Sequence, residues 1–178
     1  PVDVTLPVAD AKALSAYEGM LVRLPQTLTV SETYELGRYG SVLLSSGRLP
    51  LPTNVAPPVN GAAAQAVANA LNRIVLDDGS NQQNPGTVRY PAPGLSAANP
   101  MRAGYTVSGV QGVLEMRYNA WRLQPVPGAA APAFNAAANP RAGAPARHAQ
   151  ADVRVASFNV LNYFNGDGKG VGFDDPAN

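Results

Sequence analysis

Residues 105–124, Tyr105-Thr-Val-Ser-Gly-Val-Gln-Gly-Val-Leu-Glu-Met-Arg-Tyr-Asn-Ala-Trp-Arg-Leu-Gln124, decide the fold class of this chain. Tyr105–Val110 and Gly112–Tyr118 are two runs rich in β-branched, aromatic and other apolar residues, which is typical of strands. Asn-Ala at 119–120 then interrupts the pattern before a last short run at 121–124. A turn signal between two strand patterns predicts a hairpin. We therefore expect this part of the chain to form a closing antiparallel meander.

Further strand patterns occur earlier in the chain. Met20–Leu24 and Thr27–Ser31 both carry apolar residues near every second position, and Pro25 stands between them. Proline has no backbone N–H to donate, so the sequence predicts a strand with a break or bulge at this point. Ser41–Ser45 is a short apolar run bounded by glycines, and Arg73–Leu76 ends at an Asp-Asp-Gly turn signal.

One helix is predicted, over Asn60–Asn72, because this segment is rich in alanine and Asn60 can serve as its N-cap. Val67, Leu71 and Ile74 have helical spacing and are the expected buried face. The proline-rich passage Pro50–Pro58 before the helix is expected to be irregular.

About five strands and one inserted helix predict a mainly β fold. The order matches a small Greek-key barrel of the oligonucleotide/oligosaccharide-binding (OB) type. An SH3-like barrel or a fragment of a sandwich would give similar strand patterns, and both stay open at this level.

The composition divides the chain into three parts. Residues 1–127 form the expected barrel domain. Half of the 24 positions in 128–151 are alanine, and three prolines interrupt any helix there, so this segment is expected to be a linker. Residues 152–178 contain a strand pattern followed by a Gly/Asp-rich loop.

Bulk charge and residue usage exclude several classes of function. The net charge of +1 offers no global attraction to nucleic acid, so any such binding must be local. The absence of cysteine excludes disulfides and thiolate metal sites. His148, the single histidine, lies in the expected linker and is interpreted as a solvated bystander. No apolar stretch is long enough to span a membrane.

The apolar pattern of Val153–Val160 places Asn159 on one face of a predicted strand. An unsatisfied carboxamide in such a strand costs on the order of 1–3 kcal/mol, so Asn159 needs polar partners. A phosphate or metal site at the strand end would supply them, and so would a neighbouring loop. The pattern leaves both interpretations open.

The segment Val153-Arg-Val-Ala-Ser-Phe-Asn-Val-Leu-Asn-Tyr-Phe-Asn-Gly166 resembles the first strand of the endonuclease/exonuclease/phosphatase superfamily, in the form found in secreted bacterial extracellular nucleases. The resemblance extends upstream to the module that precedes the catalytic domain in those nucleases. It is carried there by Tyr17-Glu-Gly-Met-Leu-Val-Arg-Leu-Pro25, Leu36-Gly-Arg-Tyr-Gly40, Pro52-Thr-Asn-Val55 and Leu76-Asp-Asp-Gly-Ser-Asn81.

This resemblance implies a parent protein that is a secreted, metal-dependent hydrolase of DNA or RNA. It implies further that residues 152–178 are the incomplete start of its α/β catalytic domain. Asn159 would then be an active-site residue beside the scissile phosphate and a divalent metal, Mg, Ca or Mn. The remaining metal-binding and histidine motifs are expected beyond Asn178, and a signal peptide before Pro1. The chain by itself is expected to be an inactive monomer that binds no metal and contacts the catalytic domain of the same protein.

Aromatic and arginine side chains of the expected barrel are the candidates for nucleic-acid binding, because bases stack on aromatic rings and guanidinium groups bind phosphate. They are Tyr34, Arg38, Tyr39, Arg117, Tyr118, Trp121 and Arg122. The competing interpretation places Tyr118 and Trp121 in the core or over a hairpin and leaves the arginines as a solvated face, so that the module is a scaffold for the catalytic domain.

Two other functions remain alternatives. Phosphatases of the same superfamily act on lipid phosphates, and OB-type barrels also bind oligosaccharides, which would make the module a surface-binding domain.

Overall fold

The computed structural model describes residues 1–59, 61–140, 150–153 and 155–157. It divides into two units, Pro1–Arg141 and Ala142–Asn178. The first unit is mainly β. Its strands are β1 (Val2–Asp3), β2 (Leu21–Glu32), β3 (Val42–Ser45), β4 (Ile74–Leu76), β5 (Thr106–Arg117) and β6 (Ala120–Gln124). Its helices are α1 (Leu36–Tyr39), α2 (Pro52–Val55) and α3 (Gly61–Leu71), with single 3-10 turns at Ser15–Tyr17 and Ala136–Ala138.

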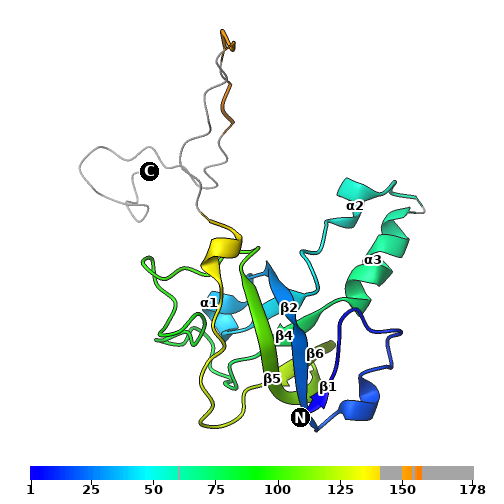
Figure 1. Ribbon diagram of the computed structural model, residues 1–178, viewed down its shortest axis with the longest axis vertical. Helices are drawn as coiled ribbons and strands as arrows, with labels where there is room; N and C mark the ends of the chain where they lie inside the picture. Colours follow the sequence, from blue (N-terminus) through cyan, green and yellow to red (C-terminus); the bar gives the residue numbers. More distant parts are fainter. Residues whose placement is uncertain (60, 141–149, 154, 158–178) are drawn as a thin grey trace, which may run out of the picture. The chain divides into compact units, whose positions relative to one another are not determined.

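Five strands close into a barrel in the order β2-β3-β4-β6-β5, and β5 pairs with β2 again to complete the ring. All neighbouring pairs are antiparallel except β4 and β6, which are parallel. The short β1 adds to the outside of β2 in parallel. Figure 1 shows β2 and β5 as the two long strands, lying side by side. The closed ring is compatible with the expected OB-type barrel and does not fit a sandwich.

The core lies inside this ring, because alternate residues of each strand point inward. It is made of aliphatic side chains, and Val88, Tyr90 and Met101 from the long β4–β5 connection pack against it. The fully buried aliphatic residues of the barrel strands include Leu24, Leu28, Leu44, Ile74, Leu114 and Leu123.

The break expected at Pro25 is a β-bulge inside one continuous strand. The pairing of β2 with β5 shifts register between Leu24 and Thr27. At the bulge the Gln26 carboxamide replaces the strand ladder: it accepts from the Leu6 N–H (3.0 Å) and donates to the Leu6 carbonyl (2.6 Å). The bulge was therefore correctly predicted, whereas the interruption of the strand was not.

The predicted helix is confirmed as α3, but its expected buried face is wrong. Val67 is 62% exposed, Leu71 is half-buried and Ile74 belongs to β4. The buried residue among those described in α3 is Ala62. The cap residue Asn60 lies outside the described residues. The passage Pro50–Pro58, expected to be irregular, contains the short helix α2, which packs on α3 and extends with it away from the barrel (Figure 1).

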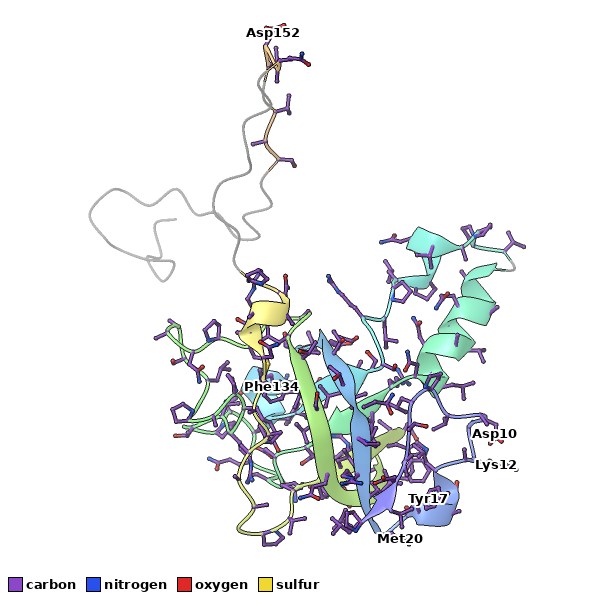
Figure 2. The ribbon with its side chains drawn as sticks, viewed as in Figure 1. Asp10, Lys12, Tyr17, Met20, Phe134 and Asp152 are labelled. Atoms are coloured by element: carbon purple, nitrogen blue, oxygen red, sulfur yellow. The ribbon has the colours of Figure 1, made fainter. Side chains whose placement is uncertain are left out.

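The barrel unit continues beyond the expected boundary at residue 127. Asn135 donates to the Thr106 carbonyl (2.7 Å), and the Asn139 amide donates to the Ala103 carbonyl (2.7 Å). Phe134, labelled in Figure 2, contacts Tyr90 edge-on and packs against the core. The alanine content predicts a linker in this part of the chain. In the structure, Phe134, Asn135 and Asn139 instead attach residues 131–139 to the barrel.

Seven residues of the second unit are described, 150–153 and 155–157, and none of them is in a helix or strand. The strand predicted for Val153–Val160 is therefore not confirmed over its described residues. Asn159 lies outside the described residues.

Candidate nucleic-acid interface

The tip of the β5–β6 hairpin is a two-residue turn made by Tyr118 and Asn119, one position earlier than the sequence suggested. Both residues have positive φ, 53° and 58°. Two left-handed central residues are typical of the type I′ turn, which normally takes Asn and Gly. A bulky aromatic residue in this conformation is an outlier and costs on the order of 1–2 kcal/mol. The turn places the Tyr118 ring in solvent, 69% exposed.

Two guanidinium groups lie against this ring. The Arg117 Cζ is 5.0 Å from the ring centroid of Tyr118, and the Arg122 Cζ is 5.1 Å from it. Cation–π contacts at these distances hold an exposed ring in place. Arg117 is exposed, and it makes a long, solvent-exposed ion pair with Glu115 at 4.0 Å. Surface ion pairs of this kind contribute little free energy, so a phosphate can compete for the Arg117 guanidinium.

Arg122, in contrast, is held in position by two hydrogen bonds. Its Nη1 donates to Asp77 Oδ2 at 2.7 Å, and both side chains are nearly buried. Its Nε donates to the Arg117 carbonyl at 3.2 Å. Because Asp77 neutralises its charge, Arg122 orients the Tyr118 ring rather than attracting phosphate.

The neighbourhood of Asp77 is buried and hydrogen-bonded. The Tyr90 hydroxyl donates to the Asp77 carbonyl at 2.8 Å, and burial raises the pKa of Tyr90 to about 12. Burial also raises the pKa of the adjacent Asp78. The turn after β4 is thus a rigid support for the hairpin beside it.

The β2–β3 connection supplies a second pair of aromatic residues. Tyr34 is 82% exposed, and Tyr39, at the end of α1, carries the Arg38 guanidinium 5.3 Å from its ring centroid. Gly40 follows in a left-handed conformation (φ 70°), and the Asp78 carboxylate lies directly over it. This contact joins α1 to the turn after β4.

The two connections border one hollow over β3, β4 and β6. It has a volume of about 440 Å³, and Tyr34, Leu43, Arg73, Tyr118 and Trp121 are among the residues that line it. A neighbouring hollow of about 470 Å³ shares Tyr118 and Arg122 with it. Figure 1 shows these strands behind the long pair β2 and β5.

The structure therefore brings six of the seven barrel candidates onto one face: Tyr34, Tyr39, Arg117, Tyr118, Trp121 and Arg122 line the two hollows. Arg38 packs on Tyr39 and acts through it. Trp121 is half-buried and packs against the core, as the core interpretation expects. Tyr118 is exposed and does not fill the core.

Sequence reasoning missed Arg73. The sequence predicts it as the first residue of a strand, whereas the structure has it exposed, just before β4, among the residues that line the hollow. One feature of the sequence could have indicated this exposure: Arg73 directly follows the predicted helix, where a connection to the next strand is expected.

Within the described residues, no cluster of three or more His, Cys, Asp or Glu side chains could hold a metal ion. Asn159, the residue expected beside a metal, lies outside the described residues. None of the described helices is long and apolar enough to cross a membrane.

Comparisons of this chain with family models, curated proteins and solved structures find no match.

Proposed function

We propose that this chain is an accessory module that binds single-stranded nucleic acid across β3, β4 and β6. The observation that carries the proposal is the exposed Tyr118 ring, set in an unfavourable turn conformation and held by two guanidinium groups. Residues kept in costly backbone conformations concentrate at functional sites, because the surrounding structure must hold them there.

The chemistry of the face suits unpaired bases. Base–aromatic stacking contributes on the order of 1–3 kcal/mol per base and tolerates any sequence. Tyr118 and Tyr34 border the same hollow, so two rings are available to one strand. In OB-type barrels the ligand lies across the second and third barrel strands and the loops that include the first and last connections. In this barrel those elements are β3, β4, the β2–β3 connection and the β5–β6 hairpin.

The resemblance of residues 153–166 extends the proposal to the whole protein. If a metal-dependent phosphodiesterase domain follows, the module holds a DNA or RNA strand for that domain, and Asn159 belongs to the active site. The sequence resemblance supports this part of the proposal, and the barrel geometry supports only the binding role.

Fluorescence anisotropy of the full chain with labelled 15-nucleotide single strands of DNA and RNA tests the binding role. Tyr118→Asn is the informative variant, because asparagine tolerates positive φ and the turn is retained. We expect it to weaken binding about 5- to 100-fold, the equivalent of one stacked base. Tyr118→Phe keeps the ring and is expected to stay within about twofold of the parent chain.

Arg117→Gln should reduce the slope of log K against log salt by about 0.7, the value for one phosphate contact to a single strand. Arg23→Gln is the charge-matched control, since Arg23 pairs with Asp3 on the outer strand β1. If the chain binds neither strand, the scaffold role replaces the binding role. Salt-independent binding of an oligosaccharide that needs Tyr118 would favour the surface-binding alternative.

A further inference from the structure

A third hollow continues from the proposed binding face toward α2 and α3. It has a volume of about 700 Å³ and lies among the end of β2, β3, α2 and α3. Glu32, Leu43 and Arg73 line both this hollow and the one that contains Tyr34 and Trp121. The two hollows therefore adjoin at these residues, and together they extend from the β5–β6 hairpin across β3 to the helical pair; this combined surface is called the groove.

Two cations line the new section without partners. Arg48 and Arg73 are both exposed, and among the described residues neither makes an ion pair or a side-chain hydrogen bond. Arg23 and Arg122, by contrast, are paired with aspartates at 2.8 and 2.7 Å. An unpaired guanidinium is free to bind a phosphate through two parallel hydrogen bonds. The acidic residue in this section is Glu32.

The wall that carries Arg48 is fixed in place. Asn72, just after α3, donates to the Ser46 carbonyl and accepts from the Ser46 N–H, at 2.9 and 3.0 Å. On the other side of Arg48, the Leu49 N–H donates to Ser31 Oγ at 3.0 Å. The Asn69 amide donates to the Pro50 carbonyl at 2.9 Å. These bonds hold the segment against α3 and β2, so the position of the Arg48 backbone is set before any ligand binds.

The residues that line this section include no aromatic side chain. Stacking is therefore confined to the hairpin end of the groove, and the helical end offers the two guanidinium groups and the amide of Asn54. One single strand of nucleic acid could use both ends of the groove. Its bases would stack on the tyrosines at the hairpin end, and its backbone phosphates would bind the arginines at the helical end.

We propose that a nucleic-acid strand bound at Tyr118 continues along this groove and that Arg48 and Arg73 bind its phosphates. This inference rests on the proposed function and adds a second, phosphate-binding subsite built by the inserted helices α2 and α3. It gives the helical insertion a role in the length of strand that the module covers.

A length series separates this inference from the proposed function. Labelled oligothymidylates from about 4 to 20 nucleotides bracket the site sizes known for barrels of this kind. The full chain should bind the shortest strands through the hairpin end alone, and its affinity should rise further once the strand is long enough to reach Arg48. Arg48→Gln should weaken only the long strands, about three- to tenfold, and lower their salt slope by about 0.7.

Glu32→Gln should act in the opposite direction and tighten the binding of long strands, because it removes the acid beside the phosphate path. Arg23→Gln lies outside the groove and should change neither the affinity for long strands nor the salt slope. Circular dichroism and melting temperature establish that each variant is folded. If Arg48→Gln and the parent chain bind long strands equally while Tyr118→Asn weakens all lengths, the subsite is rejected and the binding face stands. If the parent chain binds no oligonucleotide, both proposals fail.

Discussion

At the scale of single residues, Tyr90 connects the core to the candidate interface. Its ring is buried, and its hydroxyl donates to the carbonyl of Asp77, whose carboxylate holds Arg122. Because the folded-state pKa is raised to about 12, the folded protein retains this proton while the unfolded chain releases its own near pH 10. The stabilisation is complete below pH 10 and is lost as the pH rises from 10 to about 12.

Urea unfolding at pH 7 and between pH 9 and 12 checks this prediction. We expect Tyr90→Phe to cost about 1 kcal/mol of unfolding free energy at pH 7, the value of one buried hydrogen bond. Above pH 10 the variant should lose stability less steeply than the parent chain. Tyr34→Phe, at an exposed tyrosine, should leave both quantities unchanged. Parallel pH profiles for Tyr90→Phe and the parent chain would contradict the assignment.

At the scale of elements, helix α1 is attached to the turn after β4 through Gly40. A Cβ at Gly40 would clash with the Asp78 carboxylate, and the φ of 70° at this position is unfavourable for alanine. We expect Gly40→Ala to destabilise the fold by about 1–3 kcal/mol and to weaken nucleic-acid binding, since Tyr39 precedes it. Gly37→Ala in the same helix is the control. Its Cβ meets nothing within 4 Å, so it should be neutral or stabilise by about 0.5–1 kcal/mol. Thermal unfolding of both variants tests the difference.

At the scale of the whole molecule, the barrel closes where β5 passes from β2 to β6. Gly112 pairs with Val22 of β2, and Val113 pairs with both β2 and β6. A Cβ at Gly112 would lie 2.5 Å from the Gln124 carbonyl, so an alanine must push β6 away. We expect Gly112→Ala to lower the free energy of unfolding by about 1–3 kcal/mol, because strain at the closure acts on the whole ring. Gly86→Ala, in open space at a loop, should be neutral. Equal melting temperatures for the two variants would show that the closure tolerates a side chain.

Local rules predicted much of this fold and part of its candidate site. The strand patterns over 105–118 and 20–31 identified the long strands, and Pro25 marked the bulge, because both signals act between neighbours in the chain. The burial of α3 was not predictable in this way. Its apolar residue Val67 is exposed, and the helix is held by the hydrogen bonds of Asn69 and Asn72 to the preceding loop. The segment 131–139 was similarly mistaken for linker, because its attachment depends on contacts with Tyr90 and Thr106 far away in sequence.

The sequence by itself determined the class of this protein, a mainly β module, and the presence of the longer inserted helix α3, and it identified the candidate side chains for the proposed nucleic-acid binding. The tertiary structure alone decided which of them act together. Strand order brings the β2–β3 connection beside the β5–β6 hairpin and pairs Arg122 with Asp77, 45 residues away. It also places Arg48 and Arg73 in one groove, where neither forms an ion pair with a described residue. Periodicity is a property of neighbouring residues, whereas a binding face is made by closing a barrel over long separations in the chain, and only the closed ring determines it.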